Sequence, residues 1–147
     1  MFFRKRLIPK KEERMIVAAI KEAELQTSGE IRVHIERHCP QSDPVARAIF
    51  IFDAIGMYKT VQRNGVLIYV ALEDRKLSII GDTGINAVIP DNFWNGVRDS
   101  LRESFTKGNI TDGIVGAITS TGEILKGSFP YLEGDINEQN DEISYGK

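Results

Sequence analysis

The sequence predicts an α/β fold, in which a small sheet of mixed parallel and antiparallel strands is flanked by helices on both faces. Segments whose apolar residues have helical spacing alternate with shorter segments that are typical of strands. Residues 66–72 are apolar without alternation, which indicates a central strand covered on both faces. Together these patterns predict three layers, with helices above and below the sheet.

The length and composition of the chain suit one folded domain. Its 147 residues, 41% of them hydrophobic and 27% charged, can bury a core without metal or disulfide support. With 19 Lys and Arg against 21 Asp and Glu, the net charge is −2, so we expect no nucleic-acid partner. Cys39 is the single cysteine, and no segment has the pattern of a membrane span or a secretory signal. We therefore expect a soluble cytoplasmic protein.

The first half of the chain predicts a helix, a strand and a second helix. A helix begins near Glu12, because apolar residues recur there at helical spacing up to Ala23. Residues 30–36 alternate between apolar and charged side chains, which is typical of a half-buried strand. Asp43 and Pro44 are suited to the cap and the first turn of a helix, so a second helix is expected from there.

The second half predicts a hairpin and two more helices. The strand at residues 66–72 is followed by a short polar turn and by a strand at residues 77–81, so these two strands are expected to be antiparallel. Helices are expected from Asp91 and from Thr111 to Gly127. The organisation is then a basic arm (1–9), a single domain (10–127) and an acidic tail (128–147) with little to pack, whose acids are Glu133, Asp135, Glu138, Asp141 and Glu142.

Three acidic residues are predicted to converge at one end of the sheet. The first strand, the second helix and the second strand form a right-handed crossover, so both strands start at the same end, where the third strand finishes. Glu30, Asp53 and Asp82 then lie near one another. Three such carboxylates repel one another unless a cation binds or some of them are protonated, and Ca²⁺ and Mg²⁺ prefer oxygen ligands. The cleft around them is expected to include Ser28, Gly29, Arg63, Asn64, Thr83 and Gly84.

Simpler interpretations stand beside the cation site. Each acid is by itself more often a cap or a solvated turn residue than a ligand, and Asp53 could lie on the exposed face of its helix. His34 is on the polar face of its strand and His38 is in the loop that follows, so both are expected to be solvated. Phe93 and Trp94 are expected to be core residues.

Several segments, taken in order, resemble the TPM-domain family. They are TSGEIRV (27–33), RNGVLIYVA (63–71), EDRK (73–76), GDTGI (81–85), IPDNFW (89–94) and FTKG (105–108), and residues 137–143 are similar to the tails of a small cytoplasmic bacterial branch. The resemblance implies a mixed sheet between helices and divalent-cation binding in an acidic cleft. For plant lumenal members it also implies acid-phosphatase activity.

Two functions from different classes follow. The first is a cation-binding module for Ca²⁺ or Mg²⁺, of low to moderate affinity, whose cleft recruits a protein partner in an assembly or maintenance role. The second is a weak metal-assisted phosphatase acting on a phosphorylated small molecule, with Arg63 balancing the phosphate charge. A structural interaction protein without metal is the remaining alternative.

Overall fold

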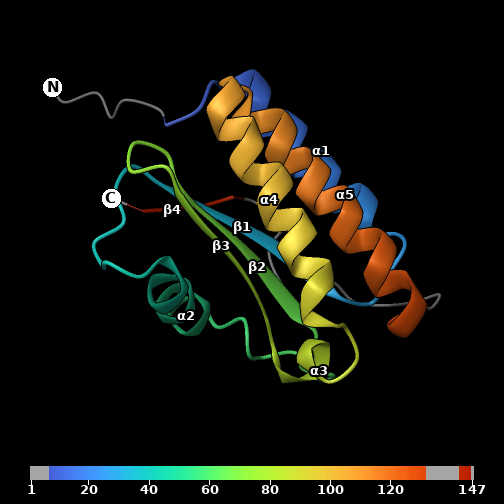
Figure 1. The fold of residues 1–147 in the computed structure, drawn as a ribbon. Coiled ribbons are helices and arrows are strands. Elements are labelled where there is room, and N and C mark those ends of the chain that lie inside the picture. The colour runs from blue at the N-terminus through green and yellow to red at the C-terminus, as the bar shows by residue number, and fades with distance from the viewer. Residues whose placement is uncertain (1–6, 132–142, 147) are drawn as a thin grey trace, which may run out of the picture.

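The computed structural model describes residues 7–131 and 143–146. It contains a four-stranded sheet in the order β3-β2-β1-β4, with helices on both faces (Figure 1), which confirms the predicted fold class. In chain order the elements are α1 (Lys10–Glu24), β1 (Glu30–Glu36), α2 (Pro44–Ala54), β2 (Gly65–Ala71), β3 (Lys76–Gly81), α3 (Thr83–Asn86), α4 (Asp91–Lys107), α5 (Ile110–Ser128) and β4 (Ser144–Tyr145).

The strand pairing agrees with the predicted topology. The crossover through α2 makes β1 and β2 parallel, with Glu30 opposite Gly65, and the hairpin makes β2 and β3 antiparallel, with Val66 opposite Gly81. The start of β1, the start of β2 and the end of β3 therefore lie at one end of the sheet. The single-turn helix α3 follows at this end, where the sequence predicted only a loop.

The two faces of the sheet bury cores of different size. Helices α1, α4 and α5 cover one face, and α2 alone covers the other (Figure 1). The main core, under the three helices, takes Ile31, Val33 and Ile35 of β1 and Val66, Ile68 and Val70 of β2. The smaller core, under α2, takes Leu67, Tyr69 and Ala71 of β2 together with Ala48, Ile51 and Phe52 of the helix. In the part of the chain that the structure describes, none of the helices has the length and apolar character that crossing a membrane requires.

The two chain ends are partly docked. Ile8, in the predicted basic arm, is buried in the main core, whereas residues 1–6 lie outside the described residues. Near the other end, Ile143 is 8% exposed, and β4 extends the sheet parallel to β1, with Ser144 opposite His34 and Tyr145 opposite Ile35. The expectation that the tail has little to pack is therefore wrong for residues 143–146. The five acidic residues of the tail lie outside the described residues.

We expect that deleting residues 143–147 destabilises the protein. Burying an isoleucine side chain contributes about 1.5–3 kcal/mol. Loss of Ile143 should then lower the melting temperature by roughly 5 °C in a domain of this size. Thermal melts followed by circular dichroism would measure the change. Ile143→Ser should reproduce most of it, whereas Tyr145→Ser, at a position that is 40% exposed, should cost much less. A truncated chain with the same melting temperature as the full-length protein would contradict the docking of this segment.

Candidate functional site

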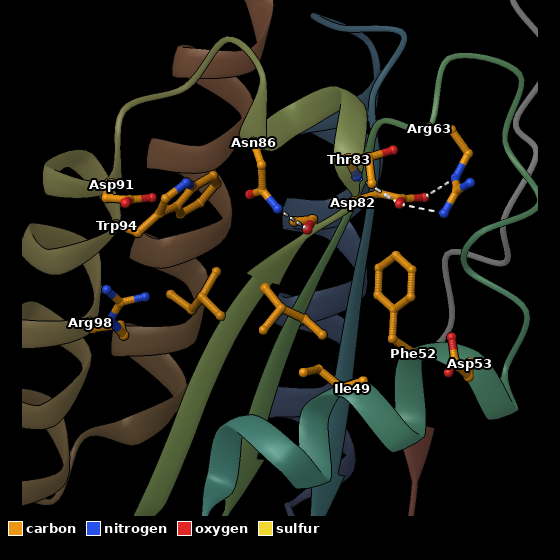
Figure 2. A pocket seen from close by; sticks show the side chains of 13 residues that line it. Ile49, Phe52, Asp53, Arg63, Asp82, Thr83, Asn86, Asp91, Trp94 and Arg98 are labelled. Carbon is orange, nitrogen blue, oxygen red and sulfur yellow. Dashed lines mark hydrogen bonds and ion pairs between the residues drawn. The ribbon is translucent and has the colours of Figure 1, made fainter.

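A pocket of about 360 Å³ opens between α2, the end of β3 and the start of α4. Figure 2 shows Asp53 at the end of α2, on the Arg63 side of this pocket, and Asp91 and Arg98 on α4 across from it. The residues that line the pocket are Ile49, Phe52, Asp53, Arg63, Ile79, Ile80, Gly81, Asp82, Thr83, Asn86, Asp91, Trp94 and Arg98. Apolar side chains thus form part of the wall, and the polar part includes three carboxylates and two guanidinium groups.

Asp82 is the most tightly held acid of the pocket. It is 5% exposed, and both of its oxygens accept hydrogen bonds from Arg63, with Nε at 2.7 Å from Oδ2 and Nη2 at 2.8 Å from Oδ1. Oδ1 also accepts the Thr83 N–H at 2.7 Å, which caps α3. The hydrogen bond to Asp82 raises the pKa of Arg63, and the charges of Asp82 and Asp53 add to this effect. The negative charge of Asp82 is therefore already compensated within the protein.

The Arg63–Asp82 pair depends on a close approach between two loops. The Gly84 N–H donates to the Arg63 carbonyl at 2.9 Å, and the Asp82 N–H donates to the Gly65 carbonyl at 2.9 Å. A Cβ atom at Gly84 would lie 2.2 Å from the Gln62 carbonyl oxygen, so only glycine fits here. Arg63 itself has a φ of 51°, a left-handed conformation that costs energy for a residue with a side chain. The fold holds this strained residue in place through the loop contacts.

The structure brings two of the three predicted acids into the pocket. Asp53 is exposed near the end of α2 and lines the pocket with Asp82, whereas Glu30 is buried at 4% and does not line it. Of the predicted cleft residues, Arg63 and Thr83 line the pocket, and the others, Ser28, Gly29, Asn64 and Gly84, lie at the same end of the sheet outside its lining. Within residues 7–131 and 143–146, no three His, Cys, Asp or Glu side chains form a group that could hold a metal ion.

The four pocket residues that follow Gly84 in the chain were not predicted as site residues from the sequence. Asn86 lies on the unpredicted helix α3, and Asp91, Trp94 and Arg98 lie on α4. The last three are spaced by three and four residues, so they share one helix face, and this spacing was the signal that could have found them. Trp94, predicted as a core residue, is 5% exposed and also forms part of the pocket wall.

A second polar cluster is buried near the other end of β1, where the sequence predicted solvated side chains. Glu36 is 2% exposed, and Arg47 of α2 donates to both of its oxygens, from Nε at 2.9 Å and from Nη2 at 2.9 Å. The Tyr69 hydroxyl also donates to Glu36. Burial opposes the charged form of Glu36, but the hydrogen bonds from Arg47 and Tyr69 outweigh it and hold the pKa of Glu36 below its usual value. The α2 helix thus covers Glu36 and supplies its counter-ion, Arg47.

His34 belongs to this cluster, so the prediction that it is solvated is wrong. It is 3% exposed, its ring is stacked against Tyr69, and Nδ1 lies 2.8 Å from Ser144 Oγ. Burial lowers the pKa of His34, and Glu36 only partly offsets this effect. His38, by contrast, is exposed as predicted, with Nδ1 2.9 Å from Asp74.

Comparisons with known proteins agree with this fold. The NMR structure of BA42 protein from the psychrophilic bacterium Bizionia argentinensis is 42% identical, covers 99% of this chain and 100% of that chain, and superposes with a TM-score of 0.90. The N-terminal domain of cg2496 from Corynebacterium glutamicum is 16% identical, with 96% of this chain and 81% of that chain covered and a TM-score of 0.64. The N-terminal domain of a P. gingivalis protein is 17% identical, with 84% and 79% covered and a TM-score of 0.68.

The last two structures are too distant in sequence to show more than the fold. A comparison with curated proteins finds no match. The sequence does match the TPM domain over residues 3–124, which include every described helix and strand up to most of α5. Because this match spans most of its length, the chain belongs to the TPM-domain family.

Proposed function

We propose that the pocket binds a divalent cation, Ca²⁺ or Mg²⁺, with low to moderate affinity, in a cytoplasmic module that also recruits a protein partner. The observation that carries this proposal is that Asp53 and Asp82, from elements far apart in sequence, line one pocket together with Asp91. Among the described residues these three carboxylates do not form a preformed ligand group, so one or two of them would bind the cation together with other oxygen donors such as the Asn86 side-chain carbonyl, the kind that hard cations prefer. The donor set therefore suits Ca²⁺ or Mg²⁺ better than a softer metal.

Arg63 acts as the internal counter-ion of this pocket. Its guanidinium occupies both Asp82 oxygens, so a cation must compete with it for that carboxylate. The Arg63 side chain is 49% exposed, which lets it move into solvent when it is displaced. This competition is a physical reason for an affinity below that of a preformed cage of carboxylates.

The partner role is supported by α2, the helix that stands alone on its face of the sheet. Its outer surface exposes Val45, Ile49 and Phe50 at 46%, 52% and 56%. Ile49 also lines the pocket, so the apolar surface continues into the candidate cation site. Exposed apolar side chains gathered on one helix are typical of a surface that binds another protein.

Substitutions on either side of the ion pair test the proposal. We expect Asp82→Asn to lower the melting temperature without cation, because the Arg63 ion pair is lost, and to abolish the rise that millimolar Ca²⁺ produces. We expect Arg63→Gln to enlarge that rise, because the guanidinium group that competes with Ca²⁺ for Asp82 is gone. Trp94, the single tryptophan, lines the pocket, so its fluorescence gives an independent binding curve.

Arg75→Gln is the matched control for Arg63→Gln. Arg75 is also exposed and left-handed, with a φ of 54°, but it lies in the β2–β3 turn at the opposite end of the sheet. Its replacement should leave the calcium response unchanged. An Asp82→Asn protein that keeps the full response, or an Arg63→Gln protein that loses it, would contradict cation binding at this pocket.

The alternative of a weak metal-assisted phosphatase is favoured by one further observation. Arg98 lines the pocket in addition to Arg63, so a second guanidinium group, one that is not paired with Asp82, is present to bind a phosphate. A cation bound at the carboxylates would add Lewis-acid activation of the phosphoryl group. Hydrolysis of para-nitrophenyl phosphate in Mg²⁺ separates the two functions. Turnover that falls in both Arg98→Gln and Asp82→Asn supports the phosphatase, and cation binding without turnover supports the module.

A further inference from the structure

We propose that His34 is a proton-controlled latch for the C-terminal strand. The neutral imidazole holds β4 against β1, and protonation of the ring favours a state in which β4 has left the sheet. This device lies in the buried polar cluster under α2, away from the pocket, and it does not depend on cation binding.

The strand register places His34 directly beside the segment that it would control. His34 lies opposite Tyr69 of β2 on one side and opposite Ser144 of β4 on the other. Its Nδ1 is 2.8 Å from Ser144 Oγ, and next to it the Gly146 N–H donates to the Ile35 carbonyl at 2.9 Å. β4 is the shortest described strand of the sheet, with two residues paired to β1. Departure of β4 would return one side of the His34 ring to water.

The surrounding charges do not accommodate a buried imidazolium well. Glu36 is the acid that faces the ring, with Oε1 3.6 Å from Nε2, but its oxygens are already engaged by Arg47 and Tyr69. Arg47 on α2 and Arg32 on β1 both oppose a positive charge on His34. From β4 the ring faces the neutral hydroxyl of Ser144. The hydrogen bonds are consistent with a neutral ring that accepts from Ser144 and carries its proton on Nε2, toward Glu36.

The sign of the pH effect follows from linkage. Burial lowers the pKa of His34 in the docked state, and departure of β4 would hydrate one side of the ring and move its pKa toward the ordinary value of 6.5. The undocked state therefore takes up a proton first as the pH falls. Docking of β4 is strongest above about pH 6.5 and weakens progressively below it, by about tenfold in the docking equilibrium for each pKa unit that separates the two states.

The test is a pair of measurements by NMR on the full-length protein. Histidine ring resonances report the pKa of His34, and amide exchange reports the protection of Gly146 relative to β2. In the wild type we expect Gly146 protection to be lost progressively as the pH is lowered from about 7.5 to about 5. The chain has two histidines, so His38→Gln gives a matched control that should keep this loss, while His34→Gln should make the protection independent of pH.

The reciprocal experiment weakens the docking of β4 and measures the pKa of His34. A Cβ atom at Gly146 would lie 2.2 Å from Glu36 Oε1, and Ile143→Ser removes the apolar anchor in the main core without touching Glu36. Both Gly146→Ala and Ile143→Ser should raise the pKa of His34 toward 6.5. Gly116→Ala, where an added Cβ meets nothing within 4 Å, should leave it unchanged. Gly146 protection that stays constant with pH in the wild type, or a pKa of His34 that is the same in all these proteins, would overturn the latch.

Discussion

Gly84→Ala is expected to destabilise the protein by about 3 kcal/mol or more, because there is no space for a methyl group at this position. The added Cβ would lie 2.2 Å from the Gln62 carbonyl oxygen and 2.7 Å from the Arg63 carbonyl oxygen. Both neighbours are backbone atoms, and Arg63 is already in a left-handed conformation, so relief requires the whole loop to move. Urea unfolding followed by circular dichroism would measure the change in the free energy of unfolding.

A second glycine gives the control for this experiment. Gly116 lies in the middle of α5, and an added methyl group there would meet nothing within 4 Å, so Gly116→Ala should stabilise the protein by up to about 1 kcal/mol through helix propensity. Both substitutions replace glycine with alanine, but they should change the free energy of unfolding in opposite directions. If Gly84→Ala unfolded at the same urea concentration as the wild type, the close approach of the two loops would be refuted.

Arg47→Met is the second change with a large expected effect. It removes the two hydrogen bonds that Arg47 donates to the buried Glu36 and leaves this carboxylate without its cation, a loss that costs about 3–5 kcal/mol in comparable buried pairs. Arg102→Met breaks a pair with Asp99 whose side chains are 60% and 75% exposed, and it should change stability by less than about 1 kcal/mol. Equal losses of stability in the two variants would contradict a larger contribution from the buried Arg47–Glu36 pair.

The same network predicts the direction of acid destabilisation. Since the folded state holds the pKa of Glu36 below its usual value, this carboxylate adds stability above the unfolded value, and that contribution is lost as the pH falls through the folded one. The penalty of Arg47→Met should therefore shrink in acid, because a protonated Glu36 no longer needs a cation. Urea unfolding of both proteins at neutral and acid pH would measure this convergence.

The fold was predictable because its signals are local and mutually consistent. The apolar run of β2, the short β2–β3 turn and the Asp43–Pro44 helix start each identify an element without its neighbours. The elements that were missed have no such signal. Helix α3 is a single turn, and β4 is two residues that become a strand only because β1 offers a partner.

The candidate site was only partly predictable, for two physical reasons. The topology identified the correct end of the sheet, but β2 lies between β1 and β3, so Glu30 is about 10 Å from the β3 end across two strand spacings. The alternation in β1 suggested a solvated face, but α2 covers that face and brings Arg47 to Glu36. A charged residue in an alternating strand gives no sign of whether a distant residue will neutralise it.

The edge of β1 that faces away from β2 is covered by different parts of the chain along its length. Near its start, the Ile31 N–H donates to the Glu24 carboxylate at 3.2 Å, and the chain just before β1 pairs with residues 129–130 through Thr27 and Pro130. Near its end, β4 supplies the partner at His34 and Ile35. Unpaired strand edges are templates for aggregation between chains. A side chain, a loop and a terminal strand thus share the task of keeping this sheet from adding strands of other molecules, and the terminal strand is the section whose loss would expose β1 to self-association.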